Sequence, residues 1–370
     1  MTTRPAAAAL VVLAALVASV LGGCKEDPSG RPARDAATGT SDAPSHHALP
    51  DGSRTDGARA DGPSADAPGQ ASHDCNSPHP AWLLCDDFEK MADGVDAWFS
   101  ASGWTEALGL GNAGRLTSST DAHGGSYALH MPAAASAGYR GADLLWRACA
   151  AKNEAGCEPL LGYPQLYFRA YIRLANDHRY VHHFLNISGG PLDDYYGPYG
   201  NAGCRPNGKR GMGTTVDFKK DTHETFFYTY YPSMNCDSGS SCANYADPQA
   251  ICDGCAKKDM PCTNGLECCW GNHFAPDTPV ALPVGKWFCL EMMMRPNDVG
   301  QSNGEMAYWI DGTLGHRTNG MRWREVDTLQ LNMVRLQHYI TTEDAKGFSN
   351  KIWFDDVVVS TERIGCIEQP

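Results

Sequence analysis

The sequence predicts an all-β protein, built as a large antiparallel β-sandwich or jelly roll. Helical periodicity is hard to find after residue 75, whereas short aromatic and β-branched runs recur between segments rich in Gly, Asn, Asp and Pro. The clearest turn is Asp311-Gly312, which follows the β-prone residues 305–310 and is typical of a tight hairpin. Many short strands separated in this way are typical of sandwiches and jelly rolls.

Four other runs have the composition of strands. The first alternates large apolar and polar residues, as a half-buried strand does, and the second is aromatic. The runs are residues 166–173, 226–231, 287–294 and 352–359. Together with the hairpin they place the folded domain in residues 75–370.

Residues 1–23 follow the order of a bacterial lipoprotein signal peptide. A short basic segment precedes residues 6–20, an apolar run that is too short to span a membrane comfortably. The run leads into Leu21-Gly22-Gly23-Cys24, which resembles the motif at which bacteria cleave the signal and attach lipid to the cysteine. We expect Cys24 to anchor the chain in the bacterial cell envelope, and Lys25 after it favours the outer membrane or the cell surface. Several acyl chains make such an anchor stable.

Residues 24–74 are expected to form the lipidated cysteine and a disordered tether. After Cys24 this segment has no aromatic residue, Ile or Val, and it is rich in Ala, Asp, Gly, Pro and Ser. It therefore cannot bury enough apolar surface to offset the entropy lost on ordering. The formal net charge of the whole chain is −13. Because phosphate binding needs clustered Lys and Arg, we expect no nucleic-acid partner, and contact with a membrane only through the lipid.

The cysteines predict a disulfide-rich domain. The chain has 15 cysteines, so an even number remains if Cys24 carries lipid, and we expect no free thiol. Residues 232–275 hold seven of them and are interpreted as a disulfide-stapled insertion rather than a zinc site. Because seven is odd, at least one bridge should leave the insertion if all cysteines pair, with Cys204 and Cys289 as the nearest outside partners.

Several segments together resemble the concanavalin A-like jelly-roll superfamily, and most of all the polysaccharide lyases that cleave alginate and glucuronan. These segments are residues 86–89, 122–130, 285–291, 303–304, 308–312 and 353–357. The resemblance implies a two-sheet jelly roll directed at an extracellular polysaccharide. A glucanase on this fold would need three carboxylates on one strand. Glu325 and Asp327 match the first two positions, but Gln330 occupies the third, so the general acid is missing.

The resemblance also implies a catalytic cluster of His183, Tyr228 and Tyr230. β-Elimination removes the proton beside a uronate carboxylate and expels the 4-oxygen, so it needs a Tyr or His to move protons and a cation or amide to neutralise the carboxylate. Tyr228 and Tyr230 are two apart and share a strand face. In the family the next strand ends in an arginine that would neutralise the carboxylate. The corresponding residues 212–218 contain no arginine, so this cation is either absent or replaced by Lys219, which follows them.

Other residues are candidates for binding substrate. Arg169 and Tyr171 alternate on one predicted strand and are expected to line the same concave face, and Tyr196 lies in an aromatic Gly/Pro loop suited to stacking on sugars. Lyases of this fold also carry a Gln-x-His pair, which Gln337 and His338 resemble in residue type. The remaining candidate is His182.

No cofactor is expected for catalysis, but the resemblance implies a structural Ca²⁺ held by Glu89 and Asp356, with a backbone oxygen near Gly124, because Ca²⁺ prefers oxygen ligands. The function that the sequence favours is a surface lipoprotein, polysaccharide lyase-like, acting on a uronate-containing glycan. The alternatives are a non-catalytic carbohydrate-binding or adhesion lipoprotein and a surface coat protein with no glycan ligand.

Overall fold

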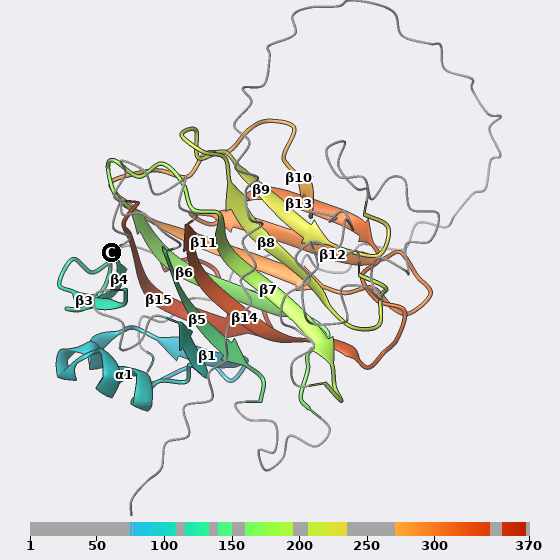
Figure 1. Cartoon of the computed structure of the whole chain (residues 1–370), viewed down its shortest axis with the longest axis horizontal. Helices are drawn as coiled ribbons and strands as arrows, with labels where there is room; N and C mark the ends of the chain where they lie inside the picture. The colour runs from blue at the N-terminus through green and yellow to red at the C-terminus, as the bar shows by residue number, and fades with distance from the viewer. Residues whose placement is uncertain are drawn as a thin grey trace, which may run out of the picture.

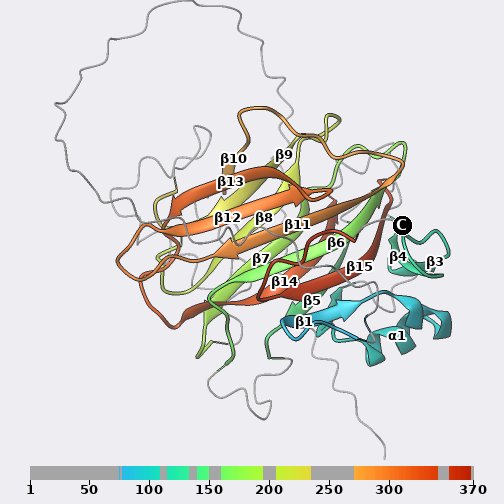
Figure 2. The same ribbon diagram turned by 180° about the vertical axis from the view of Figure 1, so that it is seen from behind.

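The computed structural model describes residues 75, 77–108, 115–132, 140–149, 160–194, 206–234, 271–340 and 350–367. Two antiparallel sheets pack against each other, and Figures 1 and 2 show them from opposite sides. The predicted all-β sandwich is therefore confirmed. Cys24, the tether and most of the predicted insertion lie outside the described residues. Within the described ranges, no helix is long and apolar enough to cross a membrane.

The first sheet has eight strands within the described residues, seven of them in one continuous order. That order is β13 (Thr313–Met321), β12 (Gly304–Ile310), β11 (Trp287–Arg295), β6 (Leu166–Leu174), β15 (Ile352–Ser360), β4 (Ala128–Met131) and β3 (Thr117–Ser119). The eighth, β1 (Trp82–Asp86), pairs with β15. The four predicted strand runs fall in strands apart from Tyr231, the last residue of the aromatic run, whose strand belongs to the second sheet.

The second sheet has seven strands in the described part of the chain. Their order is β10 (Asn272–Phe274), β9 (Thr225–Tyr230), β8 (Met212–Phe218), β7 (His183–Pro191), β14 (Leu329–Ile340), β5 (Arg140–Arg147) and β2 (Glu106–Leu108). β10 lies inside residues 232–275, the range predicted as an insertion, so the last residues of that range belong to the sheet. A three-residue strand is too short for a period-2 pattern to reveal it.

The core lies between the two sheets. Alternate residues of β6, such as Phe168 and Ile172, are fully buried in it, and so are Val334 and Leu336 of β14. Burying each such side chain contributes about 1.5–3 kcal/mol. Because every second residue of a strand is committed to this core, the others form the two outward faces of the sandwich.

The Asp311-Gly312 hairpin is confirmed. These two residues join β12 to β13, and both have positive φ, 49° for Asp311 and 77° for Gly312. Two positive φ values in a two-residue loop match the twist of the flanking strands. The Asp311 carboxylate also accepts the Cys289 backbone N–H at 2.9 Å, which ties the turn to β11.

The N-terminal segment is anchored by Asp86. Its Oδ2 accepts the indole N–H groups of Trp98 at 2.9 Å and Trp104 at 2.8 Å, and burial raises its pKa to about 6. Residues 86–89, one of the segments that resemble the jelly rolls, continue β1 only as far as Asp86, because Phe88 has a left-handed φ of 56° and a short 3₁₀-helix η1 (Glu89–Asp93) follows. Trp98 itself lies on α1 (Val95–Ala101).

Two disulfides are present among the described residues. Cys75 bonds to Cys85, and Cys289 bonds to Cys366; Cys149 is disulfide-bonded as well. The sequence had suggested Cys289 as a partner for the insertion, and this bond shows that it is not one. It faces outward on β11, where the C-terminal segment covers it, and sequence spacing does not reveal that contact.

Candidate functional site

The pairing of the second sheet aligns five residues in one row across five strands. Arg335 on β14 pairs with Asn186 on β7, which pairs with Thr215 on β8, then Tyr228 on β9 and His273 on β10. The residues that follow Thr215 and precede Tyr228 are in the core, so this row lies on the outward face. Neighbouring strands are about 4.8 Å apart, so the row is long enough to contact several sugar units.

Tyr228 and Tyr230 share this outward face. Their phenolic oxygens are 3.1 Å apart, and their rings meet edge to face. Gly271 packs against the Tyr228 ring so closely that a Cβ there would stand 2.9 Å from Cζ. Burial, and next the neighbouring Tyr230, raise the pKa of Tyr228 far above its ordinary value. Tyr228 is therefore a protonated phenol at any physiological pH, suited to donating a proton rather than removing one.

His183 lies beside these phenols, at the start of β7. Its ring centroid is 5.3 Å from that of Tyr228 and 5.6 Å from that of Tyr339, and its Nδ1 is 3.1 Å from the Asp217 carboxylate. The side chain is 27% exposed. The structure thus brings together the three residues that the sequence predicted as catalytic.

His182 joins the same cluster. Its ring is 4.5 Å from that of His183 and 5.1 Å from that of Tyr339, measured between centroids. Its Nδ1 is 3.4 Å from the phenolic oxygen of Tyr180. His182 therefore lies at the end of the face, next to the last pair of β7 and β14, which is His183 with Tyr339.

Asn186 was not predicted from the sequence to bind substrate. Its Nδ2 donates to the Thr214 carbonyl at 3.0 Å and lies 3.1 Å from the Thr215 hydroxyl. Because a carbonyl only accepts, the amide nitrogen must face Thr214, and Asn186 then presents its Oδ1. A carbonyl oxygen in this position suits a sugar hydroxyl and not a carboxylate.

Arg335 is the basic residue that the sequence analysis missed. Its Nη2 is 2.6 Å from Asp143 on β5, and its side chain is 23% exposed. Gln337, predicted to bind substrate, is two residues further along β14 and pairs with Asp143, so it shares the face, although only 6% exposed. Alternation from Gln337 would have pointed to Arg335. Lys219, suggested as the replacement cation, instead forms an exposed pair with Glu224.

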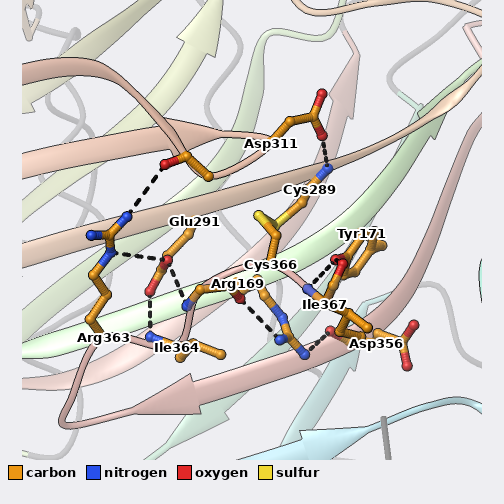
Figure 3. Close-up of a disulfide and its surroundings, with 12 residues drawn as sticks. Arg169, Tyr171, Cys289, Glu291, Asp311, Asp356, Arg363, Ile364, Cys366 and Ile367 are labelled. Carbon is orange, nitrogen blue, oxygen red and sulfur yellow. Dashed lines mark hydrogen bonds and ion pairs between the residues drawn. A yellow bond between two sulfur atoms is a disulfide. The ribbon is translucent and has the colours of Figure 1, made fainter. Parts of the chain in front are cut away.

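Arg169 and Tyr171 do not belong to this site, which corrects the prediction. Both lie on β6 in the other sheet and are almost fully buried. Arg169 donates to the backbone oxygens of Gly365 and Asp356, and Tyr171 receives the Ile367 N–H at 2.6 Å (Figure 3). The two side chains share one strand face, as predicted, but that face is covered by the C-terminal segment, which the sequence pattern could not show.

The prediction for His338 is also wrong. Its neighbours Leu336 and Ile340 are core residues, so His338 points inward and is buried. Its Nε2 donates to the Asn350 carbonyl at 2.6 Å, and burial lowers its pKa to about 3. Tyr196 lies outside the described residues.

Glu89 and Asp356, the residues predicted to hold Ca²⁺, flank one loop. Glu89 Oε1 accepts the N–H groups of Ser126 and Tyr127, and Asp356 Oδ2 is 2.8 Å from the His123 ring. Burial and the adjacent Asp356 raise the pKa of Asp355 to about 8, so negative charge is crowded beside this loop. The donors are the oxygens that Ca²⁺ prefers, but no three His, Cys, Asp or Glu side chains of the described residues gather as a metal cluster.

No protein-family model matches the sequence, and no curated protein matches it. Solved structures do match. A marine PL-14 alginate lyase from Aplysia kurodai has a TM-score of 0.51 at 16% identity, over 77% of this chain and 100% of the other. The alginate lyase vAL-1 from a Chlorella virus has a TM-score of 0.48 at 11% identity, over 76% and 99%. An endo-β-1,4-glucuronan lyase from Trichoderma reesei has a TM-score of 0.42 at 15% identity, over 71% of this chain and 95% of the other. The chain is similar in fold to polysaccharide lyases.

Proposed function

We propose that the protein is a polysaccharide lyase-like lipoprotein of the bacterial cell envelope that cleaves a uronate-containing glycan by β-elimination. One observation carries the proposal. On the outward face of the second sheet, an imidazole that can accept a proton lies beside two phenols that can donate one. The fold shared with an alginate lyase supports a polysaccharide as the substrate class.

His183 is the base in this proposal. It takes the proton from C5 of the uronate, and the electron pair left on C5 forms the C4–C5 double bond as the C4–O4 bond breaks. A phenol of the Tyr228–Tyr230 pair gives its proton to O4, so the two products are a free hydroxyl and an unsaturated uronate. The division of roles follows from the raised pKa of Tyr228, which keeps that residue a proton donor.

The uronate carboxylate must be neutralised before C5 becomes acidic enough. β14 supplies two donor side chains to this face, the amide of Gln337 and the guanidinium of Arg335. Their distances from His183 differ, because His183 pairs with Tyr339 of the same strand. Gln337 is two residues from Tyr339, whereas Arg335 is four residues away, about 13 Å at the ordinary rise per residue, so Arg335 contacts a neighbouring sugar unit instead of the reacting one. Gln337 is therefore assigned to the reacting carboxylate, and Asn186 to a hydroxyl.

The test is a screen of polyuronates for the ultraviolet absorbance of the unsaturated product. His183→Gln should abolish turnover, whereas His79→Gln, an exposed residue near the N-terminus, should retain it. Loss of activity with both substitutions, or with neither, would contradict the proposal.

A second candidate is a non-catalytic carbohydrate-binding protein. It is favoured by the charge of the face, because both arginines that the described residues place there, Arg335 and Arg147, are paired with carboxylates, Asp143 and Glu106. Such a face is weakly charged, whereas a polyuronate is strongly anionic. Glycan binding without any new absorbance would favour this candidate.

A further inference from the structure

The Asp217 carboxylate contacts two consecutive residues of β7. Its Oδ1 accepts the Phe184 backbone N–H at 3.0 Å, and its Oδ2 is 3.1 Å from Nδ1 of His183. Asp217 is only 4% exposed, so both of its oxygens are held inside the protein. The carboxylate therefore fixes the backbone and the side chain at the same point of the site.

This contact lies where the regular sheet stops. The ladder between β7 and β8 ends at Leu185 and Val216, so the Asp217 side chain accepts the Phe184 N–H where a backbone carbonyl would otherwise do so. Leu185 and Phe184 are both core residues, which breaks the alternation of β7. Strict alternation would turn His183 inward with Leu185, and the irregularity turns it outward instead.

The hydrogen bonds determine which ring nitrogen carries the proton. A backbone N–H only donates and an ionised carboxylate only accepts, so Oδ1 is committed to Phe184 and Oδ2 faces the imidazole. Nδ1 must then be protonated to form its bond, which leaves the lone pair of the neutral ring on Nε2. When Nε2 takes a proton, the resulting imidazolium is already beside a carboxylate.

We infer that Asp217 is the positioning residue that holds His183 in the Nδ1–H tautomer, with Nε2 available to remove the substrate proton. The inference deepens the proposed function and rests on it for the catalytic role of His183. The Ser-His-Asp enzymes use a carboxylate in the same way, and exchanging that carboxylate for an amide lowers kcat by about 10⁴ while the geometry persists.

The test is Asp217→Asn. The amide Oδ1 keeps the Phe184 N–H, so Nδ2 must face the ring and donate to Nδ1, which forces the proton onto Nε2. The ring ¹⁵N shifts of His183 report the tautomer directly when they are recorded at a pH where the spectrum shows the neutral ring. The resonances are assigned by their disappearance in His183→Asn. We expect Nδ1–H in the wild type and Nε2–H in Asp217→Asn, with kcat reduced about 10³–10⁴-fold and KM little changed.

Asp143→Asn is the matched control, because it makes the same chemical change at another carboxylate of this face and should leave the His183 tautomer unchanged. An Nε2–H ring in the wild type would overturn the inference, and so would an unchanged tautomer in Asp217→Asn, whatever happens to kcat. If the variant does not fold, the wild-type ring alone decides. The tautomer is measured without glycan, so it can be tested separately from activity. If the tautomer changes as expected in Asp217→Asn but the wild type cleaves no polyuronate, the proposed function is refuted and the role of Asp217 in holding the His183 tautomer is retained.

Discussion

The phenolic oxygens of Tyr228 and Tyr230 lie 3.1 Å apart on the outward face of β9. Two phenols this close share one hydrogen bond, in which only one of them donates its proton to the other. The same closeness works against ionisation of Tyr228 in the free protein, since its pKa is raised. The pair therefore suits proton donation coupled to bond cleavage.

The first prediction concerns Tyr230→Phe. The change removes one hydroxyl and almost no volume, so we expect folding to survive and glycan binding to change little. Loss of general-acid assistance should lower kcat by about 10²–10⁴-fold. Steady-state kinetics on the polyuronate identified by the screen measures the effect. Tyr231→Phe, whose hydroxyl contacts Asn272 at 3.2 Å, is the matched control. Full turnover in Tyr230→Phe would remove that residue from the chemistry.

Much of the fold was predictable because buried strands leave a strong pattern. The run around Phe168 and the Asp311-Gly312 turn were both found from composition alone. Within a strand, however, the sequence does not say what covers each face. Arg169 and Tyr171 were assigned to the site for that reason, although the C-terminal segment covers them.

The candidate site was predictable only in part. Tyr228 and Tyr230 were identified from their spacing, which sets their common face. His183 was identified by resemblance, and its outward direction depends on a bulge that no alternation pattern contains. Arg335 could have been found by alternation from Gln337, but its pairing with Asp143, a residue far away in the sequence, could not.

The second prediction concerns Arg335→Gln. Removing a charge-assisted contact to a neighbouring carboxylate should raise KM about 10–100-fold, since such contacts contribute about 1.5–3 kcal/mol, and kcat should stay within a few-fold. The single change leaves Asp143 buried without its partner. The double variant Arg335→Gln with Asp143→Asn removes both charges and should recover stability but not KM. A fall in kcat with KM unchanged would instead place Arg335 at the reacting sugar.

The third prediction concerns calcium. Burial, and next the neighbouring Asp356, raise the pKa of Asp355 to about 8. Ca²⁺ bound between Glu89 and Asp356 would offset the second of these causes, so binding should release a proton and raise the Tm. Thermal unfolding with Ca²⁺ and with a chelator measures this. Asp356→Asn should abolish the calcium-dependent shift. An identical Tm in Ca²⁺ and chelator would exclude a structural calcium at this loop.

The fourth prediction concerns the lipid anchor. Cys24→Ser removes the thiol that would carry the acyl chains, so we expect the protein to leave the membrane fraction or to remain unprocessed. Labelling with a radioactive fatty acid should be lost in the same variant. Lys25→Asp is the companion change, because it keeps the cysteine and should keep the label while altering which membrane holds the protein. Membrane association and labelling that persist in Cys24→Ser would refute the anchor.

The last prediction concerns acid stability and His338. Burial lowers the pKa of His338 to about 3, whereas an unfolded histidine titrates near 6.5. Between these values the unfolded chain binds a proton that the folded protein cannot, so stability is full above about pH 6.5 and falls as the pH falls toward 3. At pH 4.5 the loss from this residue is about 2–3 kcal/mol.

His338→Gln keeps an N–H for the Asn350 carbonyl but cannot titrate. Between pH 7.5 and 4.5 the free energy of unfolding of this variant should therefore fall about 2–3 kcal/mol less than that of the wild type. Urea unfolding across this range measures the difference. His316→Gln is the graded control, because His316 is less buried and its pKa is also lowered, so its variant should recover less. If His338→Gln and the wild type lose stability in parallel, His338 is not the group that resists protonation.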